Sequence, residues 1–385
     1  MNKIIGKIKR YTKKIICGVL STRLFKIDEK KIVFDNFNGK GFGCNPKYIA
    51  LEIIKEQLDC KMVWLVNDLN TEMPKQIKKV KFGSIRAYYE LATAKVWIDN
   101  VRNSKGVKKK KKQFYIQTWH ASLCLKKVEA DAIDKLSEKY VKDAKIDGKI
   151  TDLMISCNKA ETERYKKSFW YSGEVLECGL PRNDIIIKQS PEIKEKVYSY
   201  FGISKEEKII LYASTFRKSY NGFDVYKFDY EKCIKEISSK FGGTYKMLIR
   251  LHPNVSKYCN EFKYNENIIN ATNYDDMQEL LVATDIVITD YSSIMIDFSL
   301  IKKPVFLFAK DYDEYMKKER GFNFDFLSLP FSIAFNEEEL YKNIYNFDSK
   351  NYIEKCNEFY DRIGLYKIQH SSSKQVVERI KKIII

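Results

Sequence analysis

Short apolar segments alternate with amphipathic segments along most of this chain, in two successive series. The apolar segments of the first series lie at 31–34, 62–66, 95–98, 114–117 and 153–156; those of the second lie at 208–212, 245–251, 268–269, 285–289 and 304–308. Helices are predicted between them at 45–58, 85–93, 230–240, 277–282 and 293–301. Strands that alternate with helices form parallel sheets covered by helices. The two series therefore predict an α/β protein with two such domains, joined in the turn-rich stretch 179–191.

Length and charge agree with this organisation and narrow the partners. The chain has 385 residues, which is long for a single domain. Lys and Arg number 69 against 51 Asp and Glu, a formal net charge of +18. Such a chain favours an anionic partner, which could be nucleic acid, an acidic membrane leaflet or a phosphorylated substrate. Charge alone does not choose among these three.

The first twenty residues are basic and apolar at helical spacing, from Lys3 and Ile4 to Val19 and Leu20. This pattern predicts a helix that lies on an anionic leaflet, although a helix packed on the protein's own surface fits equally. No apolar run reaches the roughly 18–20 residues that span a bilayer, and no signal peptide is evident. We therefore expect a cytoplasmic protein at the inner face of the membrane. The run Lys108–Lys112 is interpreted as a solvated loop, with acidic lipid as the alternative contact.

The nine cysteines are scattered and form neither a Cys-x-x-Cys motif nor a cluster with histidine. We therefore expect free thiols, and neither a metal nor a cofactor is predicted. Walker and G-x-G-x-x-G loops and aromatic RNA-binding signatures are also missing from the sequence.

Two of the three histidines follow predicted strands, where open α/β sheets place reactive groups. His120 lies in Gln-Thr-Trp-His-Ala-Ser and His252 in Leu-Ile-Arg-Leu-His-Pro-Asn. Histidine exchanges protons near neutral pH, so both are candidates for catalysis. A histidine buried for structural reasons is the alternative for each.

A phosphate site is predicted where the strand at 285–289 ends. Asp290 opens a polar turn in which Ser292 is the expected N-cap, and the free amides of the following helix can bind phosphate together with Ser293. An ordinary capped helix is the alternative. Thr215 and Arg217 follow another strand, and Arg217 could hold a diphosphate or form a surface salt bridge. Arg250 is expected on the same side of its strand as His252.

At these residues the chain resembles the CDP-glycerol glycerophosphotransferase family, which builds teichoic acids and related capsular polymers. The matching blocks are Gln117–Lys127, Gly179–Asp184, Leu211–Arg217, Leu248–Asn254, Thr289–Phe298 and Arg320–Phe326. The resemblance implies a GT-B-like fold, with two Rossmann-like domains and a cleft between them. We expect a basic amphipathic helix at 1–25, an acceptor-side domain at 26–188, and a nucleotide-binding domain at 189–385 that includes a closing helix.

The resemblance also implies roles for single residues. His120 and His252 match histidines regarded as essential in the family, and Ser292 and Ser293 match its diphosphate-binding helix start. Arg250, Asp290 and Asp297 match positions on the nucleotide side. Two departures are Ala121-Ser122, where many members have Gly-Thr, and Gln369-His370-Ser371, where many have Asp-Gly. His370 is therefore left out of the site.

The implied reaction moves glycerol phosphate or ribitol phosphate from CDP-glycerol or CDP-ribitol to an acceptor hydroxyl and releases CMP. The acceptor would be a lipid-linked saccharide or a growing polymer, and the enzyme would lie peripherally on the anionic membrane surface. His120 is the expected general base, and His252 and Arg250 would stabilise the phosphates. A GT-B glycosyltransferase that uses a nucleotide sugar is the alternative; nucleic acid is not an expected partner.

Overall fold

The computed structural model of the chain describes residues 15–16, 18–19, 25–102, 106–217, 224–319, 321–366 and 370–384. The predicted basic helix at 1–25 therefore lies almost entirely outside the described residues. The chain divides into two compact units. Unit 1 contains the residues up to His120, Leu136–Arg182 and the residues from Tyr366 onward; unit 2 contains Ala121–Lys135 and Asn183–Leu365.

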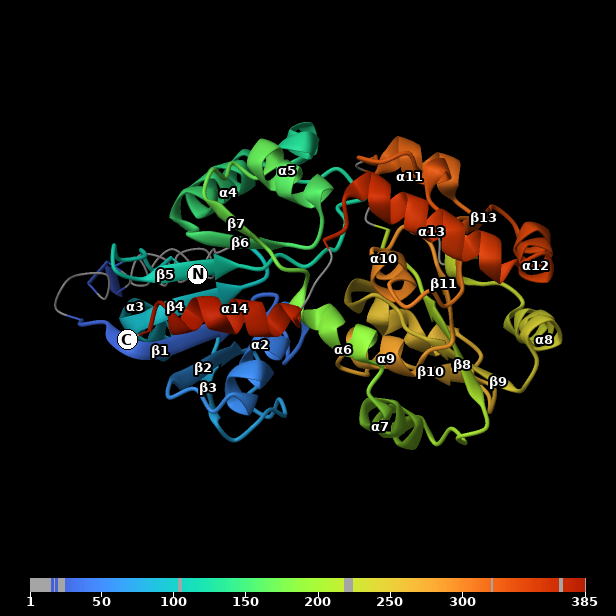
Figure 1. The fold of residues 1–385 in the computed structure, drawn as a ribbon, viewed down its shortest axis with the longest axis horizontal. Helices are drawn as coiled ribbons and strands as arrows, with labels where there is room; N and C mark the ends of the chain where they lie inside the picture. Colours follow the sequence, from blue (N-terminus) through green and yellow to red (C-terminus); the bar gives the residue numbers. More distant parts are fainter. Residues whose placement is uncertain are drawn as a thin grey trace, which may run out of the picture. The chain divides into compact units, whose positions relative to one another are not determined.

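Unit 1 is built on one parallel sheet, which has seven strands within the described residues. The strands are β1 (Asp28–Asp35), β2 (Lys61–Val66), β3 (Ile77–Lys81), β4 (Ala94–Asp99), β5 (Phe114–Gln117), β6 (Leu153–Ser156) and β7 (Glu174–Glu177). Their order across the sheet is β3-β2-β1-β4-β5-β6-β7 (Figure 1). The order reverses between β1 and β4, and open α/β sheets bind ligands at the carboxyl ends of strands beside such a reversal.

Unit 2 repeats this plan with six parallel strands among its described residues. The strands are β8 (Lys208–Ala213), β9 (Tyr245–Ile249), β10 (Ile268–Asn270), β11 (Ile286–Thr289), β12 (Val305–Phe308) and β13 (Ser332–Ala334). Their order is β10-β9-β8-β11-β12-β13, so the reversal in this unit falls between β8 and β11. Both sheets are doubly wound, as predicted.

Helices cover the sheets, and buried apolar side chains of both classes of element form the cores. Unit 1 contains α2 (Cys44–Lys55), α3 (Ile85–Thr93), α4 (Glu138–Ile150), α5 (Lys159–Ser168) and α14 (Ser372–Lys381). Unit 2 contains α6 (Asp184–Lys188), α7 (Pro191–Phe201), α8 (Tyr230–Phe241), α9 (Met277–Ala283), α10 (Ile294–Ser299), α11 (Tyr312–Lys318), α12 (Glu337–Tyr345) and α13 (Ser349–Ile363).

The central elements and the edge strand β10 match the sequence-based expectations closely, whereas the other three edge strands do not. The segments at 85–93, 114–117 and 153–156 have the predicted bounds. The strands β3, β7 and β13 were not predicted. Each lies at the edge of its sheet and contains exposed positions, so none of them is the continuous apolar run of a buried parallel strand.

The division of the chain differs from the expected domain ranges in two places. The closing helix α14, expected in the second domain, packs on α2 in unit 1 (Figure 1, red beside blue). Val376 and Ile380 of α14 share a core cluster with Ile49 and Ile53 of α2. The segment Ala121–Lys135 belongs to unit 2, where the backbone N–H of Lys127 donates to the carbonyl of Gly321 at 3.0 Å.

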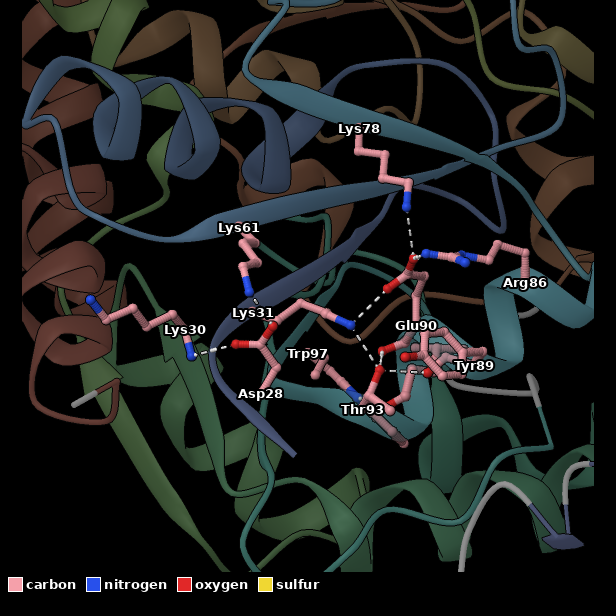
Figure 2. Close-up of polar contacts among 12 residues, drawn as sticks. Asp28, Lys30, Lys31, Lys61, Lys78, Arg86, Tyr89, Glu90, Thr93 and Trp97 are labelled. Atoms are coloured by element: carbon pink, nitrogen blue, oxygen red, sulfur yellow. Dashed lines mark hydrogen bonds and ion pairs between the residues drawn. The ribbon is translucent and has the colours of Figure 1, made fainter. Parts of the chain in front are cut away.

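A buried carboxylate surrounded by three cations stabilises unit 1 (Figure 2). Glu90 on α3 lies 2.8 Å from Lys31 Nζ, 3.1 Å from Lys78 Nζ and 2.7 Å from Arg86. Lys31, within β1, is 7% exposed and also donates to Thr93 at 2.8 Å. Burial opposes the charged form of Glu90, but the hydrogen bonds from the three cations outweigh it and lower its pKa. The carboxylate is therefore ionised in the folded chain.

We expect Glu90→Gln to lower the free energy of unfolding by about 3–5 kcal/mol, because it leaves the buried Lys31 ammonium without an anion. Urea unfolding followed by circular dichroism measures this change. The matched control is Glu52→Gln on α2, whose partner Lys55 is exposed, so the expected loss is under about 1 kcal/mol. The contribution of Glu90 is complete above the ordinary glutamate pKa of about 4.3 and disappears as the pH falls, so the difference from wild type should shrink in acid. Equal losses in both variants would contradict this account.

Candidate active site

Three neighbouring parallel strands of unit 2 end at the same edge of the sheet. The order β9-β8-β11 places their carboxyl ends side by side at the reversal of strand order. Seven of the predicted site residues follow these ends within four positions: Thr215, Arg217, Arg250, His252, Asp290, Ser292 and Ser293. The sheet topology therefore gathers residues that are up to 78 positions apart in the printed sequence, from 215 to 293.

Asp290 is the centre of this edge. Its carboxylate accepts hydrogen bonds from the backbone N–H of Thr215 at 2.8 and 3.1 Å and lies 2.8 Å from Arg217 Nη2. Arg217 also donates to both carboxylate oxygens of Asp311, at 2.7 and 2.9 Å, and Tyr291 donates to the same group at 3.1 Å. The loops after β8 and β11 are thus joined by a buried network of charged groups.

This network changes the interpretation of Arg217. Its planar fork of donors was expected to face a diphosphate or to form a surface salt bridge, and it instead faces two carboxylates inside unit 2. Burial works against the charge of Arg217, but Asp290 and Asp311 raise its pKa. Burial likewise opposes ionisation of Asp290, but Arg217 lowers the pKa of that carboxyl below its ordinary value. Arg217 and Asp290 are therefore both charged at neutral pH.

The serines lie in the turn between β11 and α10. The expectation that Ser292 is the N-cap was wrong by one residue: α10 begins at Ile294, and Ser293 occupies the cap position without a side-chain hydrogen bond. Ser292 Oγ accepts from the backbone N–H of Ile294 at 3.5 Å. Both serines are partly exposed, so their hydroxyls can reach a ligand at this edge.

Arg250 and His252 lie beyond the end of β9 at Ile249. The expectation that they share one side of a strand was wrong, because side chains alternate only within the strand. Arg250 Nη2 donates to the carbonyl of Asp275 at 3.2 Å, whereas its Nη1 is buried and has no hydrogen-bond partner within the structure. The His252 ring is exposed and stacks on Phe216 at 5.8 Å.

Asp297 faces the interior of unit 2. It is fully buried on α10 and accepts from Ser122 Oγ, from Asn183 Nδ2 at 3.0 Å and from Gln278 Nε2 at 3.4 Å. Ser122 and Asn183 are each within two residues of a point where the chain passes between the units. Asp297 therefore fastens both segments to the helix that follows the serine turn.

His120 occupies the corresponding edge of unit 1. It follows β5, the neighbour of β4, and the reversal of strand order falls between β4 and β1. Asn100, just after β4, donates through Nδ2 to Asn36 Oδ1 at 2.7 Å and accepts at Oδ1 from the N–H of Phe37 at 2.8 Å. The carbonyl of Asn100 lies 2.7 Å from His120 Nδ1. The loops after β1, β4 and β5 therefore meet at His120.

The surroundings of His120 select one protonation state. A carbonyl can only accept a hydrogen bond, so Nδ1 carries the proton and the neutral ring has its lone pair on Nε2. Burial lowers the pKa of His120 to about 4; the hydrogen bond to Asn100 opposes this effect, and the charge of Arg182 adds to it. At neutral pH the ring is thus unprotonated at Nε2 and can accept a proton.

Residues that sequence reasoning missed support these groups. Asp311 pairs with Arg217, and Asn45 and Arg182 contact the backbone around His120. Asp311 and Asn45 gave no local signal, because each is far along the chain from its partner. Arg182 lies inside the quoted Gly179–Asp184 block, where an arginine in a turn motif could have been noticed.

Three further expectations concern metals, thiols and membranes. Across the described ranges, no three His, Cys, Asp or Glu side chains form a group that could hold a metal ion. The eight cysteines there are free thiols, as expected. Of the lysine run, Lys109 pairs with Asp152 at 2.8 Å and Lys110 donates to the carbonyl of Phe25. None of the helices in the described part of the chain is both long and apolar enough to cross a bilayer.

Two doubly wound units, each with polar groups at the carboxyl edge of its sheet, place the chain among proteins with a GT-B-like fold. The fold matches the solved structure of the wall teichoic acid polymerase TagF with a TM-score of 0.85 and 29% identity, over 99% of this chain and 96% of that one. A TagF variant soaked with CDPG matches with a TM-score of 0.85 and 28% identity, over 100% and 97%.

The family model for CDP-glycerol:poly(glycerophosphate) glycerophosphotransferases matches residues 18–382. The chain belongs to this family. It is 31% identical over 366 residues to a teichoic acid poly(glycerol phosphate) polymerase of Bacillus spizizenii, covering 92% of each protein. It is also 31% identical over 348 residues to a teichoic acid poly(glycerol phosphate) polymerase of Staphylococcus epidermidis. That match covers 87% of this chain but only 48% of the relative.

Proposed function

We propose that this chain transfers glycerol phosphate from CDP-glycerol to a hydroxyl of a growing teichoic acid polymer and releases CMP. The family match and the names of its relatives support the reaction class. The observation that carries the proposal on this chain is His120, whose Nδ1 proton is held by a carbonyl while Nε2 is unprotonated at the ligand-binding edge of unit 1. The poly(glycerol phosphate) relatives favour CDP-glycerol as the donor over CDP-ribitol.

The donor diphosphate would lie at the carboxyl edge of unit 2. Arg250 Nη1 is a buried guanidinium donor without a hydrogen-bond partner among the described residues, and leaving such a donor unsatisfied is costly. An anionic phosphate oxygen would satisfy it, and the partly exposed hydroxyls of Ser292 and Ser293 are at the same edge. His252 would add a further donor from the loop after β9. Arg217 and Asp290 would act by fixing the two loops, since their charges are already paired.

His120 Nε2 would remove the proton from the acceptor hydroxyl as its oxygen attacks the β-phosphorus. The bond between that phosphorus and the bridging oxygen breaks, and CMP departs with the electron pair on that oxygen. Arg250 and His252 would stabilise the charge that develops there. The acceptor would be the hydroxyl end of the polymer or a lipid-linked saccharide, presented at an anionic membrane surface at the cytoplasmic face.

One experiment separates this reaction from the alternative, a GT-B enzyme that moves a sugar from a nucleotide sugar. The purified chain is incubated with CDP-glycerol, CDP-ribitol or UDP- and CMP-sugars, each with a lipid-linked saccharide and with poly(glycerol phosphate) in anionic vesicles. Release of CMP together with a new phosphodiester signal in 31P NMR is the expected result with CDP-glycerol. A new glycosidic product without a phosphodiester would overturn the proposal.

We expect His252→Ala to weaken both turnover and donor binding, because its ring is exposed beside the proposed diphosphate position. Loss of one hydrogen bond to a charged group costs about 1.5–3 kcal/mol, which is roughly a 10- to 150-fold change. Isothermal titration with a non-reactive CDP-glycerol analogue measures binding separately from turnover. Tyr200→Ala, an exposed aromatic on α7, is the control. Unchanged values of both quantities in His252→Ala would exclude the residue from the donor site.

A further inference from the structure

The backbone that carries His120 follows an uncommon conformation. β5 ends at Gln117, and Trp119, two residues later, has a φ of 49°. A bulky residue in this left-handed region is strained and persists only where its surroundings enforce it. Gln117 Oε1 accepts from the N–H of Trp119 at 2.9 Å, which accounts for part of that enforcement. The backbone carbonyls of the same turn accept hydrogen bonds from residues outside the turn.

Asn45, at the beginning of α2, holds the first two carbonyls. Its Nδ2 donates to the carbonyl of Trp119 at 3.1 Å and, over a longer 3.4 Å, to that of Thr118. The side chain is fully buried. Its Oδ1 accepts from the backbone N–H of Arg182 at 3.1 Å. One amide thus ties the turn after β5 to the segment that contains Arg182.

Arg182 holds the third carbonyl. Its Nη1 donates to the carbonyl of His120 at 2.7 Å, and the residue is only 6% exposed. Three successive carbonyls, from Thr118 to His120, are therefore bound by the buried side chains of Asn45 and Arg182, and the backbone of Arg182 is itself bonded to Asn45. A hydrogen bond from a charged donor is about twice as strong as a neutral one, so Arg182 is the firmer of the two.

We propose that Arg182, supported by Asn45, is a positioning residue that fixes His120 in the orientation in which it accepts the acceptor proton. Neither residue needs to touch substrate for this role, because both act on the backbone of the turn. The proposal rests on the proposed function of His120 as general base. The position of Arg182 in a turn motif does not by itself explain its side chain, and the proposal gives that side chain a role.

The same contacts also determine the electrostatic surroundings of the His120 ring. The Asn100 carbonyl and the rings of Phe37 and Trp119 contact the His120 ring, the two aromatic rings at centroid distances of 5.2 and 4.5 Å. The guanidinium of Arg182 lies at the backbone carbonyl of the same histidine. The Arg182 charge disfavours a second positive charge on the imidazole. Positioning and the neutral state of His120 would therefore weaken together when Arg182 is replaced.

The test compares Arg182→Met, Arg182→Lys and the isosteric Asn45→Asp in the full chain. We expect Arg182→Met to lower kcat by up to about 10²-fold, as small misplacements of a catalytic group do, while KM for CDP-glycerol stays near wild type. Arg182→Lys keeps the charge and one donor, so it should recover part of kcat. Asn45→Asp removes the amide donor but keeps the acceptor, and it should also lower kcat. Arg164→Met, which removes an arginine paired with Glu161 on α5, is the control.

Two readouts separate positioning from general loss of structure. In the His120→Ala background, Arg182→Met should cause no further loss of turnover; a loss as large as in the wild-type background would overturn the proposal. NMR titration of the labelled histidines should show the His120 pKa rising from about 4 toward the ordinary value of about 6.5 in Arg182→Met. An unchanged titration together with unchanged kcat would also overturn it.

These readouts distinguish failure of this proposal from failure of the proposed function. The titration needs no substrate, so it tests the Arg182–His120 contact even if the chain catalyses another reaction. If His120→Ala were fully active while the titration moved as expected, the general-base role would fall and the contact would stand. If a variant at 182 does not fold, as judged by circular dichroism, Asn45→Asp answers the same question.

Discussion

His120→Ala is expected to lower the turnover number by about 10²–10⁴-fold, the contribution that a positioned general base makes. Affinity for a CDP-glycerol analogue should stay near the wild-type value, because the proposed diphosphate site is built from residues of unit 2. Stopped assays of CMP release and isothermal titration measure the two quantities. His370→Ala, an exposed histidine outside the site, is the matched control. Near-normal turnover in His120→Ala would remove this residue from the mechanism.

The pH dependence of the wild-type enzyme tests the same residue. Because the pKa of His120 is lowered to about 4, its ring stays neutral well below the ordinary histidine pKa of about 6.5. The ratio kcat/KM, which reports the free enzyme, should keep its value as the pH falls through about 6.5 and decline only closer to 4. An acid limb centred near the ordinary value would show that another group, or a histidine in a different environment, controls the rate.

The second large effect is expected at Arg217. Arg217→Met removes the cation between two buried carboxylates, Asp290 and Asp311, and should lower the free energy of unfolding by about 3–5 kcal/mol. Urea unfolding measures the loss. Lys205→Met, whose pair with Glu195 is exposed to solvent, should leave the free energy of unfolding nearly unchanged.

Arg217→Met also separates the structural role from the earlier expectation of a diphosphate clamp. If Arg217 clamped the diphosphate, Arg217→Met would bind the donor more weakly and keep its stability. If Arg217 instead holds the ion-pair network together, the variant loses stability first. Because the pKa of Asp290 is lowered, its part of the stabilisation is complete above the ordinary aspartate pKa of about 3.9 and lost as the pH falls. A variant of normal stability and much weaker donor binding would restore the clamp.

The central architecture was predictable because buried parallel strands are continuous apolar runs. β5 and β6 lie within such runs and have the predicted bounds. The edge strand β3 carries three lysines in five residues and pairs on one side only, so its sequence resembles a polar loop. β3 is a strand because it pairs in register with β2, and the sequence of β3 alone does not show this pairing.

The positions of the candidate site residues in the fold were predictable, but the residues that their side chains contact were not. Strand ends identify where Thr215, Asp290 and His120 lie, since parallel strands deliver their carboxyl ends to one edge. What each side chain touches depends on residues distant in sequence: Asp311 for Arg217, and Asn45 and Arg182 for the turn at His120. No local pattern encodes these pairings, because they are set by tertiary packing.

The position of α14 has a consequence for folding while the chain is being translated. Val376 and Ile380 complete a hydrophobic cluster whose members also include Ile49 and Ile53, which precede them in the chain by more than three hundred residues. During translation, this side of unit 1 keeps an exposed apolar surface until α14 has been synthesised, whereas all of unit 2 is synthesised before α14. Deleting Ser372–Lys381 would therefore destabilise the unit whose strands are synthesised first.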